Sequence, residues 1–142
     1  MKTLLKNYFG YDEFRPMQEE IIKNILQGKD VLALMPTGGG KSICYQFPAL
    51  QLGGVTLVIS PLIALMKDQV DSLLANGIAA ELINSSLAPA QIAKVMEKAQ
   101  ADVLKLLYIA PERLGVPGFQ EFLQNLKISL IAIDEAHCIS QW

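Results

Sequence analysis

The sequence predicts an α/β fold in which a parallel sheet is covered by helices on both faces. Five short apolar runs alternate with segments in which apolar residues recur at helical spacing. Strands buried on both faces are near-continuous apolar runs, and strand–helix alternation is typical of parallel sheets. Hydrophobic residues make up 51% of the 142 residues and charged residues 18%, which is enough apolar surface for a buried core.

The chain begins with two predicted helices. Residues 2–10 read as a short helix that ends at Gly10, and Pro16 suits the first position of a second helix that ends at Gly28. The apolar residues that recur at helical spacing in this second helix are Ile21, Ile22, Ile25 and Leu26. We therefore divide the chain into a helical segment, residues 1–28, and an α/β domain, residues 29–142.

Strands and helices alternate in the α/β domain. The apolar runs predict strands at residues 31–35, 56–60, 80–83, 106–110 and 130–133. The intervening helices are predicted at residues 42–52, 63–76, 90–100 and 117–125. Gly77 is expected to cap the second of these helices. The apolar face of the third carries Ile92, Val95, Met96 and Ala99.

A glycine-rich loop joins the first predicted strand to the helix at residues 42–52. Three successive glycines allow backbone N–H groups to surround a phosphate, and the helix adds the positive end of its dipole. Lys41 would reach the β- and γ-phosphates, and the Ser42 hydroxyl would be a Mg²⁺ ligand. Met35 stands where the strict P-loop pattern has glycine. The phosphate-binding residues are Met35, Pro36, Thr37, Gly38, Gly39, Gly40, Lys41 and Ser42.

Two carboxylates follow the last predicted strand, at the edge where parallel sheets bind ligands. Asp134 is placed to hold the Mg²⁺ shell, and Glu135 is the natural base for the attacking water. Alone, this pair would more simply end a strand, but the P-loop earlier in the chain makes a site for ATP and Mg²⁺ the better interpretation. His137 is the sole histidine, and spacing alone assigns it no role.

Composition and charge restrict the partners and the compartment. The formal net charge of −2 gives no overall basic character, so contacts with DNA would have to be local. Cys44 and Cys138 lack metal-ligand spacing, and zinc is not expected in this segment. No leader or membrane-length apolar run is present, so we expect a cytoplasmic protein that does not bind a membrane.

Several motifs in the correct order resemble the RecQ family of superfamily-two DNA helicases. The sequence Asp134-Glu135-Ala136-His137 is the DEAH form of the superfamily motif, and the resemblance covers essentially the whole chain. It implies the first, RecA-like, ATP-binding domain of a helicase that unwinds DNA with 3′ to 5′ polarity in repair or recombination. The other stretches that carry it are 9–18, 35–42, 60–70, 108–114 and 138–142.

The resemblance also implies roles for individual residues. Gln18 would bond the adenine edge, with Tyr11 and Arg15 stacked around the base. His137 would relay between the ATP site and DNA, which adds it to Lys41, Asp134 and Glu135 as a catalytic residue. The DNA contacts implied are Ser60, Pro61, Lys67, Asn84, Ser85, Arg113 and Trp142. Without the resemblance, Asn84 and Ser85 read as turn residues and Arg113 as a charge on a helix surface.

Three alternatives remain open at this stage. A non-catalytic nucleotide-binding or interaction module would bind ATP without DNA-stimulated turnover. An RNA-directed DEAH helicase is disfavoured by the adenine motif and the Cys138–Trp142 continuation, and a P-loop kinase is disfavoured by Met35. The sequence shows no second RecA-like domain or arginine finger, and in related folds a later strand separates the acidic strand from the P-loop strand. We therefore expect residues 1–142 alone to hydrolyse ATP feebly and not to unwind DNA.

Overall fold

The computed structural model describes Glu20, Ile22, Lys23 and Leu26, and residues 43–60, 63–84, 87–101 and 103–133. The chain forms two compact units, residues 1–52 and 53–142. In the first unit, the four isolated residues are helical, as predicted, and helix α3 (Ile43–Gln51) contains Pro48. The predicted domain boundary at residue 28 and the first predicted strand lie outside the described residues.

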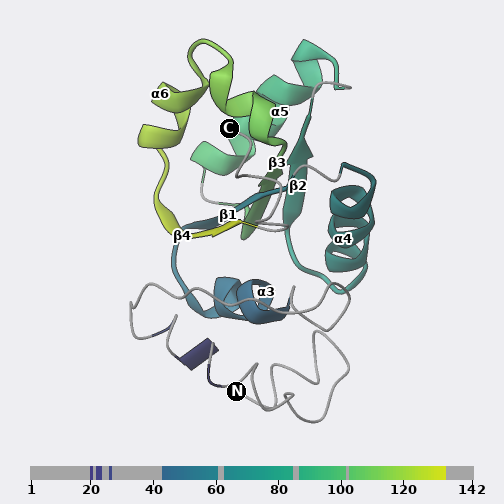
Figure 1. The fold of residues 1–142 in the computed structure, drawn as a ribbon, viewed down its shortest axis with the longest axis vertical. Helices are drawn as coiled ribbons and strands as arrows, with labels where there is room; N and C mark the ends of the chain where they lie inside the picture. The colour runs from purple at the N-terminus through teal and green to yellow at the C-terminus, as the bar shows by residue number, and fades with distance from the viewer. Residues whose placement is uncertain are drawn as a thin grey trace. The chain divides into compact units, whose positions relative to one another are not determined.

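The second unit contains a four-stranded parallel sheet (Figure 1). Its strands are β1 (Val55–Ile59), β2 (Ala80–Ile83), β3 (Leu106–Ile109) and β4 (Ile128–Ile133). Their order across the sheet is β2-β3-β1-β4, so β1 and β3 are inner strands. Each strand is short and mostly apolar, as expected where helices cover both faces. The predicted parallel α/β architecture is thus confirmed for the described residues.

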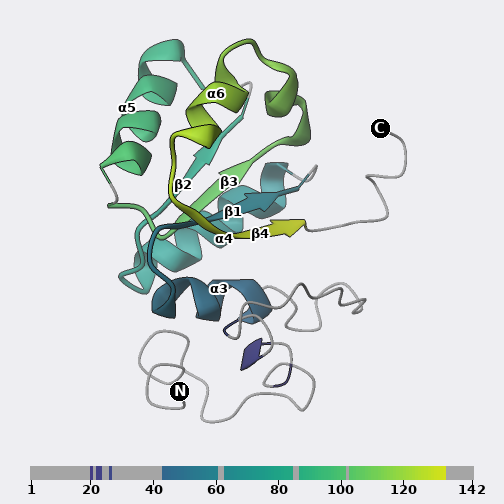
Figure 2. The ribbon, with the colours of Figure 1, turned by 90° about the vertical axis from the view of Figure 1, so that its left-hand side faces the viewer.

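Helices lie on both faces of this sheet, as Figures 1 and 2 show. Helix α4 (Ile63–Ala75) joins β1 to β2 on one face, and α5 (Pro89–Gln100) joins β2 to β3 on the other. Helix α6 (Phe119–Gln124) precedes β4 and lies on the same face as α5. Because β1 to β2 and β2 to β3 run in opposite directions across the sheet, right-handed crossovers place α4 and α5 on opposite faces.

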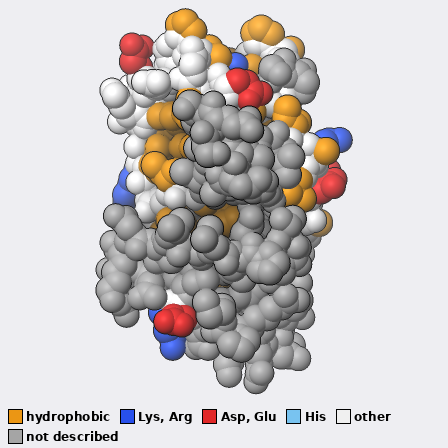
Figure 3. All heavy atoms as spheres, viewed as in Figure 1, with side chains coloured by type: hydrophobic (Ala, Val, Ile, Leu, Met, Phe, Trp, Pro, Cys, Tyr) orange, Lys and Arg blue, Asp and Glu red, His pale blue; other side chains and the backbone are white. Residues whose placement is uncertain are grey.

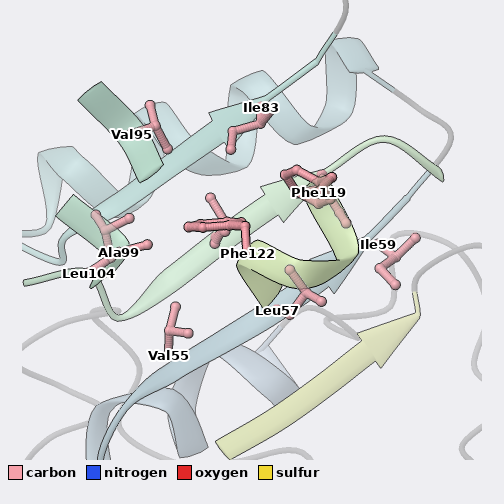
Figure 4. Close-up of a cluster of buried hydrophobic side chains, with 11 residues drawn as sticks. Val55, Leu57, Ile59, Ile83, Val95, Ala99, Leu104, Phe119 and Phe122 are labelled. Carbon is pink, nitrogen blue, oxygen red and sulfur yellow. The ribbon is translucent and has the colours of Figure 1, made fainter. Parts of the chain in front are cut away.

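The core between the sheet and helices α5 and α6 is built from alternate strand residues (Figure 4). Val55, Leu57 and Ile59 of β1 point to this face, because successive side chains of a strand alternate. Helix α5 contributes Val95 and Ala99, while Ile92 and Met96 are partly buried beside them, so its predicted apolar face is confirmed. The residues that complete the buried cluster are Ile83, Leu104, Leu107, Ile109, Phe119 and Phe122.

The end of α4 has the predicted glycine cap. Gly77 has φ +80°, and its N–H donates to the Leu74 carbonyl at 3.1 Å. The Ile78 N–H then donates to the Leu73 carbonyl at 2.9 Å, which satisfies a second carbonyl of the last turn. This turn leads the chain directly into β2.

Three differences from the predicted elements occur at α6 and on either side of it. A 3₁₀ helix, η1 (Pro111–Gly115), follows β3 and was not predicted, because five residues are too few to show a helical period. Helix α6 begins at Phe119, two residues later than predicted, and its N-terminal cap is Gly118 with φ +85°. Strand β4 starts two residues earlier than predicted, at Ile128.

The pairing of β4 with β1 contains an irregularity near its start. Val55 pairs with Ile128, but Thr56 pairs with Leu130, so Ser129 is an extra residue in β4. Just before it, the Val55 N–H donates to the Lys127 carbonyl at 2.9 Å. Gly54, with φ +82°, lies so close that a Cβ there would be 2.2 Å from that carbonyl oxygen. Only glycine fits at this approach.

Candidate nucleic-acid interface

The carboxyl ends of β1, β2 and β3 meet at one edge of the sheet. Ile109 of β3 pairs with Ile59 of β1 and with Ile83 of β2. The residues that follow these strands continue the ladder: the Ser60 N–H donates to the Ile109 carbonyl at 3.2 Å, and the Ala110 N–H donates to the Ile83 carbonyl at 3.4 Å. Ser60 and Asn84, both predicted to contact DNA, therefore flank the end of β3. This is the edge where ligands bind in open parallel sheets.

Ser60 and Asn84 are buried at this edge. Their exposed fractions are 1% and 4%, and both make interactions within the protein. The Asn84 carbonyl also accepts the Leu87 N–H at 3.3 Å, which fits the turn chemistry expected there. Buried polar side chains with partners are usual in a folded core. In this structure these two residues offer little surface to a ligand, and their predicted DNA contacts stay predictions.

Lys67 lies on the exposed side of α4. The helix buries Met66, Val70 and Leu73, and Lys67 is exposed. Helix α4 starts shortly after Ser60, so Lys67 is in its second turn, near the carboxyl edge of the sheet. An exposed ammonium on a flexible stem is suited to a phosphate contact that carries no sequence information.

Arg113 lies in η1, directly after β3. Its Cζ atom is 5.2 Å from the centre of the Phe119 ring, within the range of a cation–π interaction. Its Nε atom is buried and has no hydrogen-bond partner in the described part of the chain. Among the described residues, no carboxylate forms an ion pair with it. The edge therefore carries an arginine whose charge is not neutralised within the described part of the protein.

Phe119 is the part of this arrangement that the sequence did not reveal. It is only 2% exposed, and its ring lies 5.4 Å from that of Phe122 at an angle of 48°. Arginine and phenylalanine six residues apart do not share one face of a regular helix, and η1 with the turn at Gly118 brings them together. The one sequence signal for this contact is an arginine that shortly precedes a helix whose first residue is aromatic.

Strand β4 ends beside β1, and the position of the acidic motif that follows it stays a prediction. Ile133, the last residue of β4, pairs with Ile59, so β4 ends at the same edge as β1. An apolar strand therefore leads directly to position 134, as predicted. Asp134, Glu135, His137 and Trp142 themselves lie outside the described residues. So do the P-loop residues 35–42, the adenine-motif residues Tyr11, Arg15 and Gln18, and Pro61 and Ser85.

Charge is mixed on the face of the described residues that Figure 3 shows. Acidic and basic side chains are interspersed there, and no continuous basic patch is visible among them. This face agrees with the net charge of −2, which gives the chain no overall basic character. Within the described ranges, no three His, Cys, Asp or Glu side chains gather as a metal site, and no helix is long and apolar enough to cross a bilayer.

The parallel sheet with helices on both faces defines a class of protein, the RecA-like α/β domains. The structure matches that of the DUF1998 helicase MrfA bound to DNA and AMPPNP, with a TM-score of 0.77 and 24% sequence identity over 94% of this chain and 21% of that one. A second structure of MrfA, bound to DNA alone, matches with a TM-score of 0.69. At this level of sequence identity the match shows the fold alone, and it confirms the predicted fold class.

The family is shown by sequence. Residues 15–142 match the DEAD/DEAH box helicase family, and the chain belongs to that family. It is 55% identical over 139 residues to the ATP-dependent DNA helicase RecQ of Pasteurella multocida, covering 98% of this chain and 22% of that protein. It is 51% identical to the RecQ helicase of Bacillus subtilis, of which it covers 24%. The predicted resemblance to RecQ helicases is confirmed, and the chain spans about a fifth to a quarter of these relatives' length.

Proposed function

We propose that this chain is the ATP-binding motor region of a DNA helicase that couples ATP hydrolysis to 3′ to 5′ unwinding in repair or recombination. The 55% identity to a protein named as an ATP-dependent DNA helicase, over almost the entire chain, carries the proposal. The position of the end of β4 beside the end of β1 supports it, because position 134 then follows at the ligand-binding edge. Such a motor works in the cytoplasm, at the nucleoid.

Residues of this chain have distinct tasks in the proposed reaction. Gln18, Tyr11 and Arg15 hold the adenine, and the backbone of the P-loop holds the phosphates. Lys41 stabilises negative charge on the transferred group, and Glu135 orients the attacking water and accepts its proton. Mg²⁺ would be held by Ser42 and Asp134 and would neutralise charge between the phosphates. His137 connects this site to DNA.

DNA contacts in this proposal are made mainly to phosphates. Lys67 and Arg113 are the described cations near the carboxyl edge, and contacts with the backbone suit an enzyme that moves along any sequence. Ser60 and Asn84, being buried, would act from beneath the contact surface. Pro61, Ser85 and Trp142 complete the proposed set.

Two substitutions in the full-length protein test the chemistry through DNA-stimulated ATP hydrolysis. Lys41→Ala should lower turnover by about 10²-fold or more, because a charge that stabilises the transition state is lost. Glu135→Gln should keep ATP bound and lower turnover by about 10²- to 10⁴-fold, because an amide does not accept a proton.

The matched controls are Lys94→Ala and Glu97→Gln, which make the same changes on the exposed side of α5. Both should hydrolyse ATP as the unaltered protein does. Normal turnover by Glu135→Gln would remove the base assignment. ATP binding without any turnover that DNA stimulates, in the unaltered protein, would instead favour a non-catalytic nucleotide-binding module.

A further inference from the structure

We propose that Phe119 is a positioning residue that holds the Arg113 guanidinium at the carboxyl edge of the sheet for a phosphate group of the bound strand. The inference rests on the proposed function, because it takes DNA as the ligand. It adds a residue that does not itself reach the nucleic acid.

The cation–π contact is the first observation. The Arg113 Cζ atom lies over the Phe119 ring, 5.2 Å from its centroid. This contact restricts the motion of the guanidinium group, whose planar fork of N–H groups can donate to two oxygens of one phosphate. The ring therefore limits the positions from which Arg113 can meet a phosphate.

The ring is itself fixed by its surroundings. Phe119 is buried in the cluster between the sheet and helices α5 and α6, and it packs against Phe122 with ring centroids 5.4 Å apart. Its N–H donates to the Val116 carbonyl at 3.1 Å, and the neighbouring Gln120 side chain donates to the Leu114 carbonyl at 3.0 Å. These bonds join the start of α6 to η1. The platform and the arginine thus belong to one tightly connected segment.

Arg113 forms no ion pair with any residue that the structure describes. Its backbone is held in η1 by the bond from its N–H to the Ala110 carbonyl at 3.0 Å. Among the described residues, its buried Nε has no acceptor and no carboxylate pairs with it. An arginine with a purely structural role would normally have such partners. Arg113 as a whole is partly exposed, so a phosphate outside the protein can supply the charge partner that the described residues do not.

Prior fixation of Arg113 lowers the conformational entropy that is lost on binding, which strengthens the contact without adding another one. Loss of the Phe119 ring should therefore weaken DNA binding only through its effect on the Arg113 side chain. The affinity of the full-length protein for a short oligothymidylate, measured at several salt concentrations, tests this expectation. Arg113→Ala should reduce the slope of log affinity against log salt by about one, the contribution of one phosphate contact.

Phe119→Leu should weaken binding by roughly two- to fivefold, the range expected for an exposed or partly exposed cation–π contact. The matched control is Phe122→Leu, which makes the same change in the same buried cluster but leaves the ring beneath Arg113. It should weaken DNA binding less than Phe119→Leu does, because the Phe119 ring stays in contact with Arg113 although one of its packing partners changes. In an Arg113→Ala background, Phe119→Leu should cause no further loss, because the two residues then act as one unit.

The outcomes separate this inference from the proposed function. Equal losses for Phe119→Leu and Phe122→Leu, or a Phe119→Leu loss that persists without Arg113, would overturn the positioning role and leave packing as its explanation. Unchanged binding by Arg113→Ala would overturn the phosphate contact, and with it this inference, while DNA-stimulated ATP hydrolysis could remain. Absence of both DNA binding and ATP hydrolysis in the unaltered protein would defeat the proposed function. If either leucine variant does not fold, Phe119→Met and Phe122→Met serve instead, because the flexible methionine side chain fills irregular gaps.

Discussion

Gly54 and Gly77 share a left-handed backbone but differ in the space around them. Their φ angles are +82° and +80°. A Cβ on Gly77 would meet nothing within 4 Å, whereas a Cβ on Gly54 would be 2.2 Å from the Lys127 carbonyl oxygen and 2.8 Å from the Ser129 hydroxyl. The first glycine is needed for its conformation alone, and the second also for the close approach of β4 to the start of β1.

The two positions give a matched pair of substitutions. Gly77→Ala should lower the free energy of unfolding by about 1–2 kcal/mol, the cost of a left-handed alanine. Gly54→Ala should cost about 2–4 kcal/mol, because overpacking against backbone is added. Denaturant unfolding curves of the two variants measure the difference. Equal costs would show that the contact with Lys127 relaxes freely.

Single residues of the site show where sequence reasoning works and where it stops. Asn84 follows an apolar run, so its place at the carboxyl edge of the sheet could be predicted. Its burial could not, because that depends on segments far apart in the chain. Phe119 was missed because its contact with Arg113 depends on η1, which has no sequence period.

At the scale of elements, α5 is held on the sheet by apolar packing and by one ion pair. Val95 and Ala99 are buried against the sheet. Lys98 Nζ lies 2.9 Å from Glu81 Oε1 of β2, but the lysine side chain is 54% exposed. Exposed ion pairs add little to stability, since solvent screens them and ordering the side chains costs entropy. The apolar contacts should therefore dominate.

This comparison is testable with two truncations in α5. Val95→Ala should lower the free energy of unfolding by about 1.5–3 kcal/mol, because buried methyl groups are lost and a cavity remains. Lys98→Ala should cost less than about 1 kcal/mol, and less still at high salt. Thermal unfolding at low and high salt distinguishes the two. A larger effect of Lys98→Ala would show that the ion pair, not the apolar face, fixes α5.

The elements that were predicted well have strong periodic signals. Strand β2 has the predicted bounds, and α4, α5 and the described helix α3 differ from prediction by at most one residue at each end. The early start of β4 was missed because Ser129 and Lys127 interrupt the apolar run. The η1 helix was missed because its conformation depends on the turn after β3 and not on a repeat of apolar residues.

At the scale of the second unit, the sheet order determines which backbone amides are best protected. Strand β3 is paired on both sides, by β1 and β2, and all four of its side chains are buried. Its amides should therefore exchange with solvent at rates close to those set by global unfolding. Those of β2, an edge strand in the described sheet, should exchange faster by local opening. Native-state hydrogen exchange resolved by residue measures both, and faster exchange in β3 than in β2 would contradict this account.

The parallel sheet was predictable as a whole, but the order of its strands was not. Alternation of apolar runs with helical segments implies parallel strands. The place of β3 between β2 and β1 depends on how the helices pack on the two faces of the sheet, and no single segment of the sequence shows this packing. The same holds for the candidate site. The sequence predicts which edge of the sheet carries it, but not how exposed the residues along that edge are.

The extra residue Ser129 makes the length of β4 as consequential as its composition. Because Val55 pairs with Ile128 and Thr56 with Leu130, deletion of Ser129 would remove the bulge and leave the pairs up to Ile59–Ile133 in register. Insertion of one residue after Leu130 would have the opposite effect, because successive side chains of a strand alternate. If the pairing at the start of β4 is kept, each side chain from Ile131 onward would move to the other face of the sheet. The loss of one codon is therefore tolerable at this strand, whereas the gain of one reverses the direction in which the chain leaves the sheet.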